Sequence, residues 1–285
     1  KHSDNHALWI DPKDGNHLLA GTDAGLYETF DDGTTWRHFP NMPISQFYKV
    51  AMGNTEPFYN ILGGAQDLGT LYGPSRTTNT EGVRNQDWYI PMGADGYNVA
   101  IDPTDPNTVY SAGFYGTIQR SNMATGETQG IVPRPGPGEP NYRGQWVAPF
   151  IISPHNPRII YHGMNYLFRS MYQGDSWTRI SPDLTFNDPE KYGDIPYQTI
   201  FSISESPFKF GLIYVGTDDG RVWRTDDGGA NWNEIERGLP YQKWVAELVA
   251  SRYDEGTVYM AQNGKRDDDF TPYLWKSTDY GNRWT

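Results

Sequence analysis

Short apolar runs alternate with turn residues along most of the chain, and no run has the spacing of a long amphipathic helix. The first 40 residues show four strand-like runs, "ALWIDP", "HLLAGT", "GLYETF" and "TWRHF". Tyr, Trp, Thr, Val and Ile, which favour strands, recur in similar runs between Gly, Pro, Asn and Asp. This pattern predicts an all-β protein with many turns.

One turn segment recurs four times: "TFDDGTTW" from Thr29, "SMYQGDSW" from Ser170, "TDDGGANW" from Thr225 and "STDYGNRW" from Ser277. The shared pattern is Ser/Thr-x-Asp-x-Gly-x-x-Trp, with Tyr172 in place of Asp in the second copy. We call these four segments the repeat turns. Their defining residues are Asp31, Gly33, Trp36, Gly174, Trp177, Asp227, Gly229, Trp232, Asp279, Gly281 and Trp284.

A second repeat, seen in "IDPTDPNTVYSAG" and "ISPHNPRIIYHG", lies between the repeat turns, and the two together divide the chain into six units. The expected units are 6–40, 46–90, 97–133, 146–181, 197–238 and 244–285. Four strands in about 45 residues is the arithmetic of a β-propeller blade, so residues 1–285 are predicted to form one propeller. The sixth unit stops before its fourth strand, and we expect a longer parent chain with at least a seventh blade.

Composition narrows the range of partners. The net charge is −12 and no basic stretch is longer than a pair, so a nucleic-acid partner is not expected. No apolar run approaches a membrane span, and the absence of cysteine excludes disulfides and thiolate chemistry.

The repeat turns resemble Asp-boxes (BNR repeats), which occur in sialidases, xyloglucanases and sortilin-type receptors. Segments such as "HALWIDP", "GGAQDLGTLYGPSRT", "GEPNYRGQW" and "YVGTDDGRVW" are similar to bacterial sortilin-like, Asp-box-containing exported proteins. The resemblance implies a secreted, periplasmic or cell-surface location. It also places each repeat turn between the third and fourth strands of a blade, away from any active site.

The repeat turns are therefore predicted to be structural. Asp bonds to nearby backbone N–H groups, Gly supplies a positive φ angle, and Trp packs under the turn. A catalytic role for Asp227 would require Asp31 and Asp279 to be redundant catalysts.

The opposite face, at the entrance to the propeller axis, is the expected binding surface. The turns between second and third strands and the links between blades meet there, and aromatic side chains recur in them beside acids and amides. Such a surface suits a glycan or an extended polypeptide. The candidate ligand-binding residues are Gln66, Asp67, Asp95, Tyr97, Tyr142, Arg143, Trp146, Tyr241 and Trp244.

The first functional hypothesis is a propeller that binds glycan or polypeptide, and the alternative is a glycoside hydrolase. A glycoside hydrolase needs two carboxylates, and the candidates are Asp67, Asp95, Asp218 and Asp219. Asp67 in "AQDLGTLY" resembles the "TDIGG"-like segment that carries a catalytic Asp in Asp-box xyloglucanases. Sequence alone leaves open whether the protein is catalytic, and which ligand it takes.

No metal or other cofactor is expected, because the six histidines lack the paired spacing of a metal motif. A calcium ion at Asp267, Asp268 and Asp269 is the alternative to a solvated acidic loop.

Overall fold

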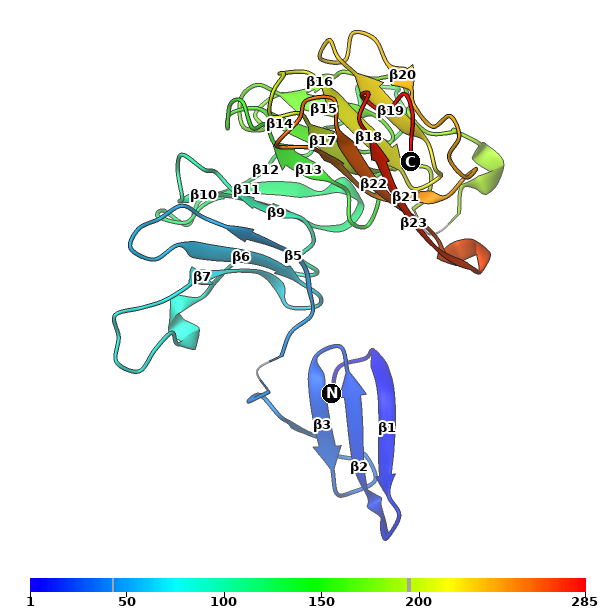
Figure 1. The fold of residues 1–285 in the computed structure, drawn as a ribbon. Helices are drawn as coiled ribbons and strands as arrows, with labels where there is room; N and C mark the ends of the chain where they lie inside the picture. Colours follow the sequence, from blue (N-terminus) through cyan, green and yellow to red (C-terminus); the bar gives the residue numbers. More distant parts are fainter. Residues whose placement is uncertain (43, 194–195) are drawn as a thin grey trace.

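The computed structural model describes residues 1–42, 44–193 and 196–285. These residues form six antiparallel sheets, five with four strands and one with three, in which neighbouring strands follow one another along the chain (Figure 1). The helices in this part of the chain are short 3₁₀ turns: η1 (Asn85–Asp87), η2 (Phe114–Gly116), η3 (Pro189–Lys191) and η4 (Lys265–Asp267). The all-β propeller fold predicted from the sequence is confirmed.

The strands of the first three sheets are β1 (Asn5–Asp11), β2 (Asp14–Thr22), β3 (Gly25–Thr29), β4 (Arg37–His38), β5 (Phe47–Met52), β6 (Asn60–Ala65), β7 (Gly69–Pro74), β8 (Tyr89–Met92), β9 (Val99–Ile101), β10 (Thr108–Ala112), β11 (Ile118–Asn122) and β12 (Thr128–Gly130). Those of the last three are β13 (Phe150–Ile152), β14 (Ile160–Gly163), β15 (Leu167–Ser170), β16 (Thr178–Arg179), β17 (Ile200–Glu205), β18 (Ile213–Thr217), β19 (Val222–Thr225), β20 (Asn233–Glu234), β21 (Trp244–Ala250), β22 (Val258–Gly264) and β23 (Asp269–Ser277).

The core lies between neighbouring sheets. Each of the four apolar clusters found among the described residues joins two successive sheets from the second to the sixth. Tyr110, Tyr161 and Tyr214 occupy equivalent places in β10, β14 and β18 and are fully buried. Both faces of the middle sheets are therefore covered, as stacking around an axis requires.

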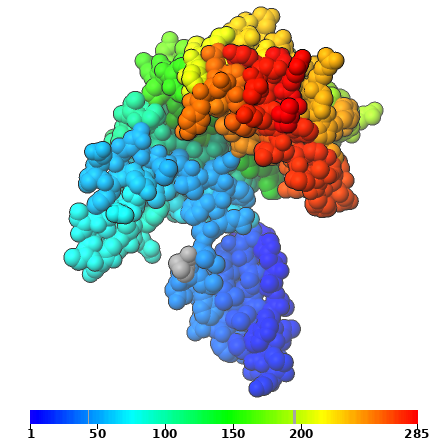
Figure 2. All heavy atoms as spheres, viewed as in Figure 1, coloured from blue at the N-terminus to red at the C-terminus, as the bar shows by residue number. Residues whose placement is uncertain are grey.

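The first sheet differs from the expected radial arrangement. It stands apart from the other five in Figure 1, and it protrudes from them in the space-filling view (Figure 2). Leu8, Trp9 and Ile10 of β1 remain 63%, 46% and 52% exposed, so the apolar residues of this strand are not covered by a neighbouring sheet. Its link to the second sheet includes a hydrogen bond of 2.9 Å from Gln66 Nε2 to Asp23 Oδ2.

Each repeat turn follows the third strand of its sheet and is closed by local hydrogen bonds. In the turn after β19, Asp227 accepts from Thr225 Oγ1 at 2.8 Å and from Asn231 N and Nδ2 at 2.9 and 2.8 Å. Thr225 Oγ1 in turn accepts from the Gly229 N–H at 2.9 Å. These bonds hold the pKa of the exposed Asp227 at about 2, below its usual value.

The repeat turns also join one sheet to the sheet before it. In three of them the tryptophan Nε1 donates to a backbone oxygen of the preceding sheet: Trp177 to Ile131 at 2.6 Å, Trp232 to Ile180 at 2.9 Å and Trp284 to Ile235 at 2.7 Å. Arginines of the preceding third strand donate in the other direction: Arg120 to the Gln173 oxygen at 2.8 Å, Arg169 to Gly228 at 3.2 Å and Arg224 to Tyr280 at 2.9 Å. Two neighbouring sheets are thus joined by one tryptophan bond and one arginine bond, and we call these two bonds together the interblade latch.

Candidate functional site

The two ends of the strands carry different kinds of side chain. Asp218 and Asp219 lie just before β19, and Asp227 lies just after it. Because the two turns leave opposite ends of one strand, Asp218 and Asp227 lie on opposite faces of the propeller. Asp67, between β6 and β7, has the same place in its sheet as Asp218, so it belongs to the axis-entrance face.

A chain of contacts begins at Asp67 on this face and crosses from the second sheet to the third. The Asp67 N–H donates to Asp95 Oδ1 at 2.6 Å, and the Tyr97 hydroxyl donates to Asp95 Oδ2 at 2.9 Å. The Tyr97 ring lies edge-on to Phe114, with 5.3 Å between the ring centroids.

The chain continues into the fourth and fifth sheets. Phe114 contacts Trp146 with 6.0 Å between ring centroids, and the Trp146 N–H donates to Gln145 Oε1 at 2.9 Å. Gln145 Nε2 then donates to Asp218 Oδ2 at 2.6 Å. The structure thus connects four sequence-predicted residues, Asp67, Asp95, Trp146 and Asp218, along one rim.

Asp67 and Asp95 sit next to each other in unequal environments. Asp67 Oδ2 is buried and has no hydrogen-bond partner among the described residues. Burial raises the pKa of Asp67, and the charges of Asp95 and Asp23 raise it further. Both Asp95 oxygens accept hydrogen bonds, one from the Asp67 N–H and one from the Tyr97 hydroxyl. A carboxyl group whose pKa is raised therefore lies beside a second carboxyl group that two donors hold in place.

Asp218 and Asp219 are almost fully buried, at 2% and 1% exposure. Burial raises the pKa of Asp218 to about 7, although it accepts hydrogen bonds from the Thr199 N–H and Oγ1 at 2.8 and 2.9 Å. Burial also raises the pKa of Asp219, which accepts from the Phe186 N–H at 2.8 Å. The two acids mainly hold neighbouring backbone in place, and Asp218 also borders a cavity.

Three of the predicted ligand-binding residues are engaged inside the protein. Tyr97 is fully buried, so it supports Asp95 from behind and presents no surface to a ligand. Arg143 Nη2 donates to Asp183 Oδ2 at 2.9 Å, and the Tyr192 ring covers the guanidinium at 4.5 Å.

Tyr142 packs against Tyr166 and Phe168, with ring centroids 5.7 and 4.8 Å away. Its hydroxyl donates to Glu139 at 3.2 Å. Tyr142 therefore covers the aromatic side chains of the fourth sheet.

Other predicted residues do reach solvent. Trp146 is 43% exposed and Tyr241 is 74% exposed. Tyr115 is 49% exposed beside Trp146, with 6.3 Å between the ring centroids. Exposed ring faces beside carboxylates are suited to the apolar faces and polar edges of sugars.

The sequence interpretation did not select Gln145 or Tyr115 as site residues. Gln145 is buried and bonds to Asp218 across 73 positions of sequence, which no local pattern shows. Tyr115 has a φ angle of 57°, which is strained for a bulky residue, and such strain often accompanies function. In the sequence, only the glycine that follows Tyr115 in "FYG" indicated an unusual turn at this position.

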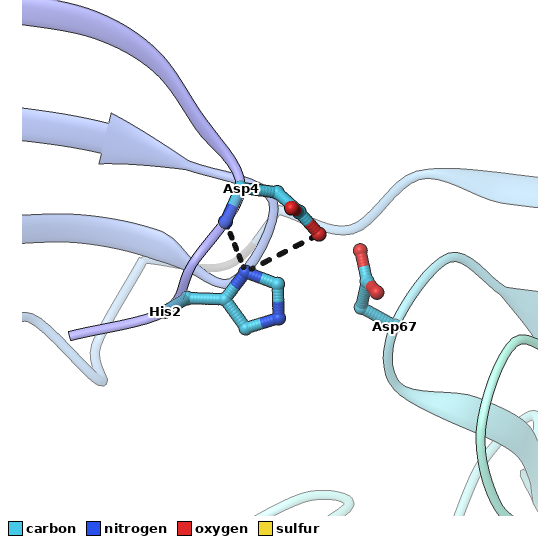
Figure 3. Close-up of side chains that lie close together, drawn as sticks. All are labelled: His2, Asp4 and Asp67. Carbon is cyan, nitrogen blue, oxygen red and sulfur yellow. Dashed lines mark hydrogen bonds and ion pairs between the residues drawn. The ribbon is translucent and has the colours of Figure 1, made fainter.

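One group of side chains offers metal-type ligands. His2, Asp4 and Asp67 each present one ligand atom, and these atoms lie within 4.8 Å of one another (Figure 3). His2 Nδ1 already accepts from the Asp4 N–H at 3.2 Å. Two of the three residues come from the exposed N-terminal segment, and nothing else among the described residues indicates a metal, so we assign none.

The acidic loop around η4 is partly neutralised within the protein. Lys243 Nζ lies 3.2 Å from Asp267 Oδ2 and 3.0 Å from Asp269 Oδ2. The ammonium group therefore occupies two of the carboxylates that a calcium ion would use.

No helix among the described residues is long and apolar enough to cross a membrane.

Comparison with curated proteins finds two xyloglucanases. One from Paenibacillus sp. is 29% identical over 232 residues, which are 69% of this chain and 21% of the relative. A probable oligoxyloglucan-reducing end-specific xyloglucanase from Neosartorya fischeri is 28% identical over 204 residues, 67% of this chain and 24% of the relative. The chain thus matches between a fifth and a quarter of each relative's length. No family model matches the sequence.

Solved structures support the propeller fold. An ancestral GH74 enzyme has a TM-score of 0.58 at 16% identity, covering 96% of this chain and 36% of the other. YCF48 from Cyanidioschyzon merolae has a TM-score of 0.50 at 14% identity, covering 99% of this chain and 84% of the other. At these identities the likeness shows the fold alone, and the relationship to xyloglucanases rests on the sequence matches. The sortilin-like assignment remains a prediction.

Proposed function

We propose that this chain is part of a glycoside hydrolase that cleaves a xyloglucan-type polysaccharide. The observation that carries the proposal is the Asp67–Asp95 pair, in which one carboxyl group has a raised pKa and a buried oxygen without a hydrogen-bond partner, and the other is held by two donors. The two matched relatives are named for activity on xyloglucan, which favours hydrolysis over binding alone.

The two acids take different roles in this proposal. Asp67 is the proton donor to the leaving oxygen, because burial and neighbouring charges raise the pKa of its carboxyl group. Asp95 is the partner carboxyl group, which acts on the sugar directly or through a water molecule. Tyr97 is a positioning residue, because its buried hydroxyl fixes Asp95.

The rings of Tyr115 and Trp146 supply the binding surface in this proposal. They are exposed in the adjoining sheets and suit stacking against successive sugars of an extended chain. A propeller that only binds glycan would use the same rings, so this feature is shared with the second candidate function. Activity on a polymer is consistent with an extracellular location, which we propose with the function.

The test is hydrolysis of xyloglucan, measured as release of reducing ends, with Asp67→Asn and Asp95→Asn variants. Each variant should lose at least about 100-fold in kcat and still bind polysaccharide, the range expected for a missing acid or base. Asp226→Asn is the control, because Asp226 is an exposed residue within a repeat turn on the opposite face. A protein that binds xyloglucan without cleaving it would refute hydrolysis and establish the binding function.

A further inference from the structure

A cavity of about 560 Å³ lies at the junction of the fourth and fifth sheets, on the face that carries the repeat turns. Its walls come from the fourth sheet, from the turn between β17 and β18, and from the repeat turn after β19. The lining includes Arg169, Arg179, Phe210, Asp227 and Ala230. This face is opposite the proposed catalytic pair, so the cavity is a separate feature of the molecule.

The neighbouring junction, between the third and fourth sheets, has a carboxylate in the corresponding place. There Arg120 Nη1 donates to the Gln173 oxygen at 2.8 Å as part of its interblade latch. Arg120 Nη2 pairs with Asp175 Oδ1 at 2.9 Å. Asp175 is the sixth residue of its repeat turn, "SMYQGDSW". A carboxylate from the chain itself therefore neutralises the latch arginine at this junction.

The latch arginine of the cavity makes the same backbone contact without the carboxylate. Arg169 Nη1 donates to the Gly228 oxygen at 3.2 Å, as Arg120 does to the Gln173 oxygen. The sixth residue of this repeat turn, "TDDGGANW", is Ala230, which has no acidic group to offer. Arg169 Nε is buried and has no hydrogen-bond partner in the part of the chain that the structure describes.

The third latch also has an acidic partner for its arginine. At the junction of the fifth and sixth sheets, Arg224 Nη2 lies 3.7 Å from Asp226 Oδ2. Of the three latch arginines, Arg169 is thus the one that forms no ion pair with the described residues. The cavity lies beside this arginine.

Two acids near the cavity already have donors of their own. Asp227 accepts from its own turn. Glu205 accepts from the Gly211 N–H at 3.0 Å and from the Tyr161 hydroxyl at 2.9 Å. Because a guanidinium group with unused N–H donors is best satisfied by a carboxylate, Arg169 is suited to an acidic group from another molecule.

The surroundings favour a polypeptide as the source of that acid. The cavity lies within the roughly 300–1,000 Å³ of ligand sites, so one carboxylate would fill only a small part of it. Phe210 in the lining is 45% exposed, and Phe208 on the same turn is 48% exposed. An acidic residue flanked by an apolar one would meet both kinds of surface. The carboxylate at the neighbouring junction, that of Asp175, also belongs to a polypeptide turn.

We propose that this cavity binds an acidic segment of another polypeptide, whose carboxylate pairs with Arg169 as Asp175 pairs with Arg120. An apolar side chain next to the acid packs against Phe210. The proposal does not depend on hydrolysis, because the site lies on the face opposite Asp67 and Asp95.

The experiment measures binding of the capped peptide Gly-Asp-Phe-Gly by calorimetry and by the ¹⁵Nε–¹H signals of the arginine side chains. Gly-Asn-Phe-Gly lacks the carboxylate, and trigalacturonate carries carboxylates on a sugar chain; both are comparison ligands. Arg169→Lys assigns the Arg169 signal, keeps the positive charge and removes the paired N–H donors.

Ala230→Asp tests the same site without removing the latch arginine. It supplies a carboxylate from the chain itself, at the position that Asp175 has in its own repeat turn. Arg252→Gln is the control, because Arg252 is an exposed arginine in the turn between β21 and β22, on the same face.

Gly-Asp-Phe-Gly should shift the Arg169 Nε signal, and Gly-Asn-Phe-Gly should bind at least about tenfold more weakly. Arg169→Lys and Ala230→Asp should each weaken binding of the acidic peptide about tenfold or more, while Arg252→Gln leaves it unchanged. No binding of the acidic peptide, equal affinity for the two peptides, or unchanged affinity in Ala230→Asp would overturn the proposal. Binding of trigalacturonate in place of the peptide would also overturn it.

Discussion

From the interblade latch we predict that the indole N–H group of a single tryptophan stabilises the contact between two neighbouring sheets. Trp232 Nε1 donates to the Ile180 oxygen at 2.9 Å, and Ile180 is only 8% exposed. Trp232→Phe keeps an aromatic ring under the turn and removes the donor. The Ile180 carbonyl then loses this bond in a place that water reaches poorly.

The magnitude follows from the cost of an unsatisfied buried acceptor, about 1–3 kcal/mol. Unfolding entropy near the melting temperature is about 2.1 cal/mol/K per residue. Multiplied by 285 residues, this gives about 0.6 kcal/mol/K. Dividing the cost by this entropy, we expect Trp232→Phe to lower Tm by roughly 2–5 °C, measured by circular dichroism on heating.

Trp36→Phe is the matched control, because the same residue in the first repeat turn bonds to its own turn. Trp36 Nε1 donates to the Gly33 oxygen at 2.9 Å and joins no preceding sheet. We expect a smaller fall in Tm than for Trp232→Phe. Equal falls in the two variants, or no fall in Trp232→Phe, would show that the bond to the preceding sheet contributes nothing.

Two further predictions concern a repeat turn and a buried histidine. Asp227→Ala should lower Tm and leave glycan binding intact, because the Asp227 side chain closes its own turn. The control Asp226→Ala should change neither Tm nor binding. Lost binding at an unchanged Tm in Asp227→Ala would contradict this structural role. Burial lowers the pKa of His162 to about 4 from 6.5, so the unfolded chain binds the extra proton between these values. The contribution of His162 to stability should therefore fall by about 3 kcal/mol as pH drops through that window, while Asp218, whose pKa is raised to about 7, contributes in the opposite direction. Denaturant unfolding from pH 7.5 to 4.5 checks this, and a His162→Gln variant with the same acid dependence would refute it.

The fold could be predicted from the sequence because the same strand and turn motifs recur from sheet to sheet. A repeat turn needs only residues within a few positions of one another, such as Thr225, Asp227 and Asn231. The offset of the first sheet was not predictable in this way. It depends on whether Leu8, Trp9 and Ile10 find another sheet to cover them, and that is a property of packing.

The candidate site was only partly predictable, because its side chains are arranged by contacts between distant segments. Connectivity alone placed Asp67, Asp95 and Trp146 on one face. It could not show that Arg143 would pair with Asp183, 40 positions away, or that Tyr97 would be buried. Arg143 and Tyr97 are residue types that often contact ligands. Here tertiary packing uses them to support neighbouring residues instead.

The pKa values of the aspartates show the same division between local and distant causes. In Asp227 the pKa falls because donors from its own turn surround an exposed carboxylate, and the sequence motif contains all of those donors. In Asp67 and Asp218 the pKa rises, chiefly because distant segments fold over them and remove water. The acids that form a recognisable motif are therefore held ionised and act in structure. The acids suited to proton transfer are those whose environment is built only when the sheets come together.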